Sequence, residues 1–216
     1  MRLFSRKNLV FLETEDKPVV RKIFNNEKSL FRELIILNFL RDRIEVPKVI
    51  STRIEKKEIF LEYIEGTPFS DLSIKEFFSA VHLVVGWLRR LHSIGIEKGD
   101  CNPRNFILNK GKIYGLDFEE AGIIIDSQGI VRDLVDLAST SMISIYHRER
   151  DRELALEAFN EIVKSYGPVL PSALEYIPLI KSFLVQRKKY RPELAAIFEE
   201  LISEVDKLGE KDSKYL

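Results

Sequence analysis

The sequence has a single cysteine, no excess of charge of either sign and no long apolar run. Because Cys101 is the only cysteine among 216 residues, the chain cannot form an internal disulfide or a cysteine-rich zinc site. Thirty-four Lys and Arg residues balance thirty-four Asp and Glu residues, so the formal net charge is zero. This balance removes any global electrostatic argument for binding nucleic acid or an anionic membrane, and we do not expect nucleic acid among the partners.

Apolar stretches are short throughout the chain. The longest candidates, residues 34–40 and 81–88, fall well below the roughly 18 apolar residues that a membrane-spanning helix needs. The first seven residues also lack the apolar run of a signal peptide. The composition, 45% hydrophobic and 31% charged, is that of a folded globular protein. We therefore expect a cytoplasmic protein that does not contact a membrane, and its oligomeric state stays open.

Hydrophobic periodicity divides the chain into two unequal parts. Before residue 66 the pattern predicts strands around one helix, whereas helical spacing dominates from Ser73 onward. A short linker is predicted at Gly66–Pro68. We therefore predict an α+β fold with a strand-rich lobe of residues 1–65 and a larger, mostly helical lobe of residues 66–216. The expected strands are 9–12, 18–24, 48–50, 58–63, 106–108 and 112–116, and the expected helices are 26–41, 73–95 and most of the chain after Val131, with breaks at 167–168 and near Pro192.

Three polar residues stand in an unusual order in the middle of the chain. Asp100 and Asn105 lie in a loop rich in Gly and Pro signals, and Asp117 ends an otherwise apolar strand. A carboxylate at that position is costly to bury unless a cation or a strong donor meets it. Phosphoryl transfer needs one carboxylate to orient and deprotonate the acceptor, and an amide with a second carboxylate to hold Mg²⁺ on the nucleotide phosphates. Ligation by oxygen alone suits Mg²⁺ rather than zinc.

A plainer interpretation of the same residues is an Asp-capped loop and an Asx turn beside a hairpin. An isolated Asp-x-x-x-x-Asn spacing is common by chance. The order of loop, strand, turn, strand and Asp is much rarer, and it favours a phosphotransferase site with Asp100, Asn105 and Asp117 as its catalytic residues.

These segments resemble the protein-kinase-like superfamily, in particular its aminoglycoside phosphotransferase, choline kinase and lipopolysaccharide kinase branch. Residues 99–105 are similar to the catalytic loop of those enzymes, and residues 117–119 to their metal-binding motif. Residues 91–95 resemble the end of the preceding helix, 62–66 the hinge, and 131–134 the later Asp-Leu motif that braces the catalytic loop. The resemblance covers roughly residues 18–140. It implies ATP and Mg²⁺ as cofactors, Asn105 and Asp117 as metal ligands, and an adenine contact through the backbone of Glu62, Tyr63 and Ile64.

The resemblance also implies a strand lysine that pairs with a glutamate on the adjacent helix. Lys22 and Glu33 fit these positions as nucleotide-binding residues. Glu33 shares a helix face with Leu30 and Leu37, and a carboxylate on that buried stripe requires a cation. A register error of one residue would exchange Lys22 for Arg21, and Lys22 could also be an ordinary exposed lysine.

Two departures from the kinase-like pattern weaken the expectation of catalysis. No glycine precedes Gly66, so a Gly-rich phosphate-covering loop is missing, and residues 5–8 stand in its place. Lys98 occupies the position of the histidine that usually precedes the catalytic aspartate by two residues. A pseudokinase that binds nucleotide without turnover therefore remains an alternative.

The residues after Asp117 indicate which class of molecule accepts the phosphate. Glu119 replaces the usual Gly of a protein kinase, and only fifteen residues separate Asp117 from Asp133, which leaves no room for a peptide-docking segment. We therefore predict transfer of the γ-phosphate to a small-molecule hydroxyl, on a sugar, an aminoglycoside or an amino alcohol. Acidic residues that could meet a cationic substrate, or could simply be solvated, are Asp126, Asp133, Asp136, Glu149 and Asp151.

The compact size also resembles RIO-like kinases and the small kinase of the threonylcarbamoyl-tRNA machinery. The resemblance implies an alternative function, an atypical protein kinase or ATPase within an RNA-linked complex. The basic run at 187–191 would serve such a partner, because Lys and Arg bind phosphates and Tyr190 can stack on a base. A charge run on a terminal helix is more often solvated.

Overall fold

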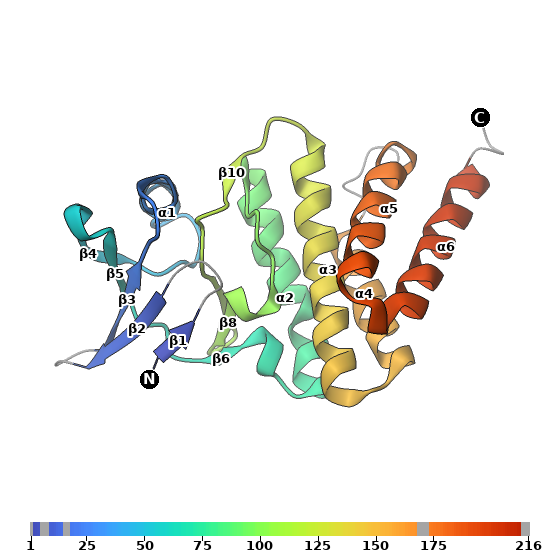
Figure 1. The fold of residues 1–216 in the computed structure, drawn as a ribbon, viewed down its shortest axis with the longest axis horizontal. Helices are drawn as coiled ribbons and strands as arrows, with labels where there is room; N and C mark the ends of the chain where they lie inside the picture. The colour runs from blue at the N-terminus through green and yellow to red at the C-terminus, as the bar shows by residue number, and fades with distance from the viewer. Residues whose placement is uncertain (1, 5–8, 15–17, 168–172, 213–216) are drawn as a thin grey trace.

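A computed structural model gives the structure of the chain and describes residues 2–4, 9–14, 18–167 and 173–212. The fold is α+β: a small antiparallel sheet with one helix forms one end of the molecule, and a larger set of helices forms the other (Figure 1). This arrangement confirms the predicted fold class, a kinase-like fold with a reduced sheet lobe and a larger helical lobe.

Five antiparallel strands make up the sheet, in the order β1-β2-β3-β5-β4. Their bounds are Arg2–Phe4 for β1, Leu9–Thr14 for β2, Pro18–Ile23 for β3, Val49–Arg53 for β4 and Glu58–Glu62 for β5. The strand β1 was not predicted from the sequence. Pro18 opens β3, where its missing N–H is tolerated because the ladder only begins there.

Helix α1 (Glu27–Leu40) packs on this sheet and carries one charged residue on its buried face. Asn26 caps the helix by accepting a hydrogen bond of 2.9 Å from the amide of Ser29. The buried face is otherwise aliphatic, as the Leu spacing predicted, and its members are Leu30, Glu33, Ile36, Leu37 and Leu40. The sheet and α1 therefore place one carboxylate inside an apolar layer.

The segment predicted as a linker forms a short strand instead. Thr67 and Pro68 make up β6 (Thr67–Pro68), which pairs with β8 (Phe106–Asn109), and β8 pairs with β9 (Lys112–Gly115). Gly66 lies so close to β8 that a Cβ there would stand 2.4 Å from the carbonyl oxygen of Leu108. Close backbone approach, which the sequence pattern does not reveal, explains this glycine.

In the described residues of the larger lobe the α-helices are α2 (Ile74–Ser93), α3 (Ser127–Glu149), α4 (Arg152–Tyr166), α5 (Ala173–Tyr190) and α6 (Ala195–Asp212). Helix α2 begins at the predicted capping box, in which Ser73 and Glu76 bond reciprocally. The helix predicted from Val131 begins earlier, because Asp126 caps α3, and it ends at Arg150 in a left-handed conformation. In the part of the chain that the structure describes, no helix is both long and apolar enough to cross a membrane.

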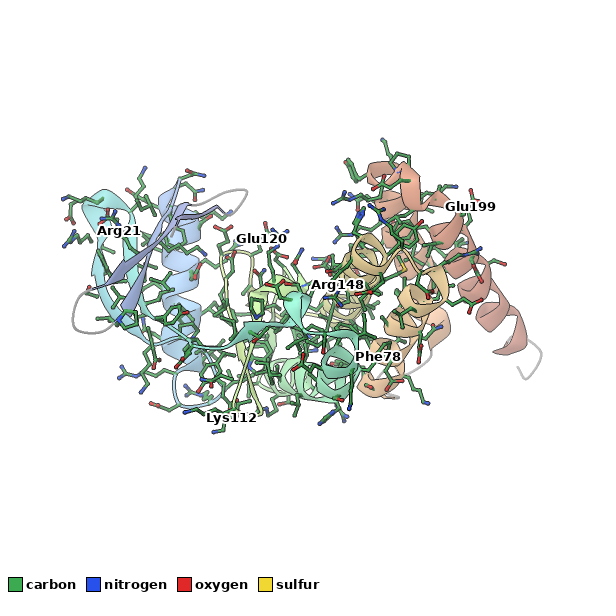
Figure 2. All side chains as sticks on the ribbon, turned by 90° about the horizontal axis from the view of Figure 1, so that it is seen from below. Arg21, Phe78, Lys112, Glu120, Arg148 and Glu199 are labelled. Carbon is green, nitrogen blue, oxygen red and sulfur yellow. The ribbon has the colours of Figure 1, made fainter. Side chains whose placement is uncertain are left out.

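A short two-stranded ladder, β7 (Ile96–Glu97) with β10 (Gly122–Ile123), lies between the lobes and frames the central loops. Figure 2 shows the segment that carries Glu120 between the sheet lobe, where Arg21 lies, and the helices that carry Phe78 and Arg148. Of the site residues predicted from the sequence, Asp100, Asn105 and Asp117 lie on these central segments, whereas Lys22 and Glu33 lie in the sheet lobe.

Candidate functional site

The loop of residues 98–105 connects β7 to β8 and carries Asp100 and Asn105. Gly99 has φ +81°, and a Cβ there would stand 2.3 Å from the carbonyl oxygen of Glu120. After Gly99 the carboxylate of Asp100 accepts a hydrogen bond of 3.2 Å from the amide of Asn102. The amide nitrogen of Asn105, on the turn η3 (Pro103–Asn105), donates to the carbonyl of Asp100 over 3.4 Å. These contacts leave the Asn105 side-chain oxygen able to act as a ligand.

Asp117 follows β9 in a strained conformation. Its φ is +60°, in the left-handed region that non-glycine residues rarely adopt. Such a conformation costs on the order of 1–3 kcal/mol and persists where the surroundings enforce it, as at functional sites. The surroundings include Lys22, whose ammonium lies 2.8 Å from the Asp117 carboxylate.

Lys22 joins the two lobes through a buried cluster of three charges. The residue is 4% exposed, and its side chain pairs with Glu33 of α1 as well as with Asp117. The register puts Lys22 opposite Ile59 of β5, on the face that looks toward α1 and Asp117. The structure therefore brings together Lys22, Glu33 and Asp117. Lys22 and Asp117 are 95 residues apart in the sequence.

Electrostatics in this cluster favours a charged lysine and a charged Asp117. Burial would lower the pKa of Lys22, but the negative charges of Glu33 and Asp117 outweigh it and raise that pKa. Burial would raise the pKa of Asp117, but Lys22 and then Lys98 outweigh it and lower that pKa. The pKa of Glu33 is raised, because burial is its largest influence and exceeds the lowering by Lys22. The charged form of Glu33 therefore depends strongly on the contact with Lys22.

A second buried network, made of hydrogen bonds to Asp133 of α3, holds the loop of residues 98–105. The carboxylate of Asp133, on α3, accepts hydrogen bonds from the amides of Lys98 (2.5 Å) and Gly99 (2.8 Å). It also lies 3.0 Å from Nε2 of His92, whose Nδ1 is 2.5 Å from the hydroxyl of Tyr166. Sequence reasoning placed Asp133 beside this loop by resemblance but missed His92 and Tyr166, because nothing in the pattern links residues 74 positions apart.

The acidic residues considered for a cationic substrate have internal partners. Asp126 caps α3 and Asp151 caps α4, each by accepting a backbone hydrogen bond. Asp136 accepts from the amide of Cys101 at 2.8 Å and pairs with Arg187. Glu149 pairs with Arg148 over 2.8 Å. Asp126, Asp133, Asp136 and Asp151 are therefore helix caps or braces, whereas Glu149 is an exposed residue paired with its neighbour in the chain.

The basic run at 187–191 is partly neutralised by neighbours. Arg187 pairs with Asp136, Lys188 with Glu199 over 2.5 Å, and Arg191 with Glu193 over 3.6 Å. Tyr190 is 69% exposed. Three of the cations that were expected to meet phosphates are therefore held by carboxylates of the same lobe.

The segment predicted to contact adenine leads from the sheet to the helical lobe. Tyr63 is 40% exposed, whereas Ile64 is buried. The carboxylate of Glu62 accepts a hydrogen bond of 3.3 Å from the amide of Lys48, so the side chain turns away from Lys22. Residues 5–8, expected in place of the Gly-rich loop, lie outside the described residues.

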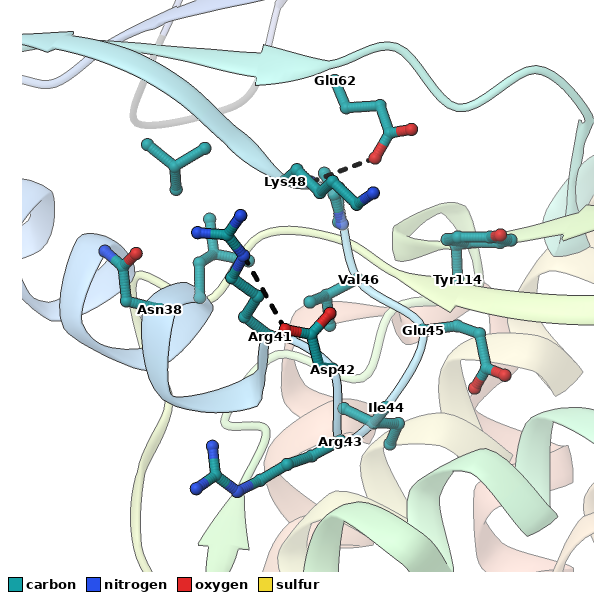
Figure 3. A pocket seen from close by; sticks show the side chains of 13 residues that line it. Asn38, Arg41, Asp42, Arg43, Ile44, Glu45, Val46, Lys48, Glu62 and Tyr114 are labelled. Atoms are coloured by element: carbon teal, nitrogen blue, oxygen red, sulfur yellow. Dashed lines mark hydrogen bonds and ion pairs between the residues drawn. The ribbon is translucent and has the colours of Figure 1, made fainter.

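Glu62 also lines a pocket on the outer side of this segment (Figure 3). The pocket measures about 320 Å³ and contains neither Asp100 nor Asp117. The ion pair of Arg41 with Asp42 (3.9 Å) and the ring of Tyr114 both line it (Figure 3). The pocket is therefore separate from the charged cluster around Lys22.

Metal ions in proteins are bound by clusters of side chains. In the described residues, no group of three or more His, Cys, Asp or Glu side chains gathers in a way that would hold a metal ion. Asn105 and Asp117 offer one amide and one carboxylate oxygen, a donor set that fits Mg²⁺ when nucleotide phosphates and water supply the other ligands.

Comparison with known proteins defines the family. The KEOPS complex subunit Bud32 of Pyrococcus abyssi is 31% identical over 155 residues, which are 69% of this chain and 67% of that protein. A probable serine/threonine-protein kinase BUD32 homolog of Archaeoglobus fulgidus is 34% identical over 76 residues, or 35% of this chain and 37% of that protein. A probable bifunctional tRNA threonylcarbamoyladenosine biosynthesis protein of Methanosarcina acetivorans is 37% identical over 76 residues, which are only 13% of its length.

No protein-family profile matches the sequence. The chain belongs to the Bud32 family, and hence to the protein-kinase-like superfamily. This finding overturns the predicted branch and acceptor: the relatives are not aminoglycoside or choline kinases, and a small-molecule phosphotransferase was the wrong prediction. The expectation of a small-molecule partner without nucleic acid was also wrong, because the names of the relatives refer to a protein complex and to tRNA modification.

The error has a physical cause. Absence of a peptide-docking segment argued against conventional protein kinases, but it says nothing about partners that bind elsewhere on the surface. A net charge of zero likewise does not exclude work on RNA within a complex whose other subunits supply the positive charge.

Proposed function

We propose that this chain is an ATP-dependent phosphotransferase or ATPase of the Bud32 type, which acts with protein partners in tRNA modification. The contact of Lys22 with both Glu33 and Asp117 is the observation that carries the proposal. In this arrangement a cation that can bind phosphates stands next to a carboxylate that can hold Mg²⁺.

The two lobes have separate tasks in this proposal. Residues 1–65 are the nucleotide-binding lobe, with Lys22 toward the phosphates and the backbone of residues 62–64 toward adenine. Residues 66–216 are the catalytic lobe. Support comes from the positions of Lys22 and Glu33 in the first lobe and of Asp100 and Asp117 in the second.

Asp100 is the proposed base. Its carboxylate takes the proton of the attacking hydroxyl or water as the γ-phosphoryl group moves from ATP to that oxygen and ADP leaves. Asn105 and Asp117 would hold Mg²⁺, which neutralises charge on the phosphates when it is bound. Lys22 orients the phosphates, and Glu33 fixes the direction of Lys22. Helix α1 therefore contributes to the reaction through its one buried carboxylate.

The relatives direct the proposal toward macromolecular partners. One relative is a subunit of the KEOPS complex, and another is a bifunctional protein of threonylcarbamoyladenosine biosynthesis. We propose that this chain binds a protein subunit of such a complex and that ATP turnover serves the modification of tRNA. Faster ATP hydrolysis on addition of the partner subunits and tRNA would support this role, and a rate unchanged by both would contradict it.

The first test is ATP binding and hydrolysis with and without Mg²⁺. We expect Asp100→Asn to bind ATP with nearly the wild-type affinity but to lose turnover by about 10²–10⁴-fold, because it removes the base alone. We expect Asp117→Asn to lose the Mg²⁺ dependence of binding.

Asp42→Asn is the matched control, because Asp42 has φ +62°, close to the +60° of Asp117, yet is exposed. It should behave as wild type in binding and turnover. ATP binding with no turnover above background in wild type would support a nucleotide-binding pseudokinase instead. No binding at millimolar ATP would refute the proposal altogether.

A further inference from the structure

Lys98 is a fully buried lysine beneath the two segments that carry the proposed catalytic residues. Its exposed fraction is 0%, the lowest among the buried charged residues of the described chain. The ammonium nitrogen lies 3.1 Å from the main-chain oxygen of Asp100 and 2.5 Å from the main-chain oxygen of Asp117. One side chain therefore connects the loop of the proposed base to the residue proposed to hold the metal.

The remaining surroundings of this ammonium are also defined. It lies 4.7 Å from the centre of the Phe118 ring, within the range of a cation–π contact. The amide of Lys98 itself donates to Asp133 of α3. The residue is thus anchored through its backbone to a long helix and through its side chain to two loops.

Asp117 is held from two directions by two lysines. Lys22 contacts its carboxylate, and Lys98 contacts its carbonyl. Lys22 belongs to the sheet lobe, so its contact depends on how the lobes sit together. Lys98 belongs to the same lobe as Asp117, and its contact opposes relaxation of the left-handed backbone at Asp117 whatever the sheet lobe does.

We propose that Lys98 is a positioning residue that fixes the main chains of Asp100 and Asp117 relative to each other, so that base and metal ligand keep one geometry through the reaction. The role rests on the proposed phosphotransferase or ATPase function. Lysine suits it because an ammonium carries three N–H donors and can serve both carbonyls at once, whereas a neutral imidazole carries one.

Lys98→Met tests the role, since methionine matches the length of the stem and removes every donor. We expect kcat for ATP hydrolysis to fall by about 10²-fold, the effect of a small misplacement of catalytic groups. The KM for ATP at saturating Mg²⁺ should change by less than about threefold, because Lys22 is untouched. The Mg²⁺ concentration for half-maximal activity should rise.

Two further variants separate positioning from simple packing. Lys98→His keeps a ring N–H and should lose less kcat than Lys98→Met. Lys112→Met removes an exposed lysine from the nearby strand β9 and should match wild type. If Lys98→Met is folded and keeps wild-type kcat and Mg²⁺ dependence, the inference is wrong.

A second measurement needs no activity and covers the case in which Lys98→Met fails to fold. An ammonium hydrogen-bonded to two carbonyls and shielded from water exchanges slowly, so its ¹H–¹⁵N signal should be visible in wild-type protein and absent from Lys98→His. If the Lys98 signal is missing from a spectrum that shows the ammonium signal of Lys22, the positioning role of Lys98 is overturned.

The outcomes distinguish this inference from the proposed function. A protected Lys98 signal in a protein that neither binds nor hydrolyses ATP would refute the function and, with it, the role in the reaction. Normal ATP hydrolysis by wild type and equally by Lys98→Met would leave the function standing and refute the inference alone.

Discussion

The two lobes hold their buried charges in different ways. In the sheet lobe, Lys22 and Glu33 come from a strand and a helix, and they complete their pairing with Asp117 across the boundary between the lobes. In the helical lobe, one carboxylate, Asp133, accepts from two consecutive backbone amides and contacts His92 without leaving that lobe.

The difference separates a contact that lobe movement can change from one that it cannot. Side-chain ion pairs between lobes form only when the lobes are together, so the contact of Lys22 with the Asp117 carboxylate depends on how the lobes sit. The hydrogen bonds that the backbone amides of residues 98 and 99 donate to Asp133 lie within one lobe and do not depend on the sheet lobe. The loop proposed to be catalytic is therefore held within its own lobe, whereas the lysine proposed to bind phosphates reaches Asp117 across the boundary between the lobes.

The largest effect on stability is expected from removing the Asp133 carboxylate, which holds the loop of residues 98–105 in the helical lobe. Asp133→Ala leaves two backbone amides and His92 without their acceptor, and each unsatisfied buried group costs about 1–3 kcal/mol. We expect the free energy of unfolding to fall by roughly 4 kcal/mol, measured by urea denaturation.

Asp126→Ala is the matched control for that variant. It removes a cap from the start of the same helix and should cost only about 1 kcal/mol. Equal losses for the two variants would show that Asp133 is no more than a helix residue.

The next largest effect concerns the contact between the lobes. Lys22→Met leaves Glu33, 1% exposed, without its cation, and we expect a loss of about 3 kcal/mol in unfolding free energy. The double variant Lys22→Met/Glu33→Leu should recover part of that loss, because Glu33 no longer needs a cation while Asp117 still lacks Lys22. Lys56→Met, at an exposed position, should be neutral. A double variant as unstable as the single one would mean that the charges do not depend on each other.

The smallest effect is expected at high pH. It concerns Tyr166, whose hydroxyl contacts His92 in the network around Asp133. Burial raises the pKa of Tyr166 from 10.0 to about 12. Between these values the unfolded chain gives up the phenol proton while the folded chain keeps it, so folding stability falls as pH rises. In Tyr166→Phe this contribution is absent, and unfolding free energy should fall less steeply from pH 10 to 12 than in wild type or in Tyr114→Phe. Parallel pH profiles for all three proteins would contradict the assignment.

Much of this architecture could be predicted because it depends on neighbours in the chain. Asn26 and Ser73 start their helices through contacts three residues away. Leu spacing marks the buried face of α1, and the same spacing puts Glu33 on it. The order of Asp100, Asn105 and Asp117 along loop, strand, turn and strand indicated a kinase-like site for the same reason.

Other features could not be predicted, because packing between distant segments decides them. In the sequence, Lys98 only stands where kinase-like proteins usually have a histidine. In the structure it is buried under two loops, and its ammonium contacts a main-chain carbonyl of each. Gly66 was expected to mark a linker, whereas close approach to Leu108 makes it part of a sheet.

By itself, the sequence determined the periodicity, the caps and the spacing of the polar residues, since these depend on contacts within a few residues. Only the tertiary structure decided which charges meet. Asp126, Asp136 and Asp151 looked alike as acidic residues on helices, but two are helix caps and one holds the loop of residues 98–105. A buried charge is stable only beside its partner, and the fold alone brings partners such as Lys22 and Asp117 within 2.8 Å.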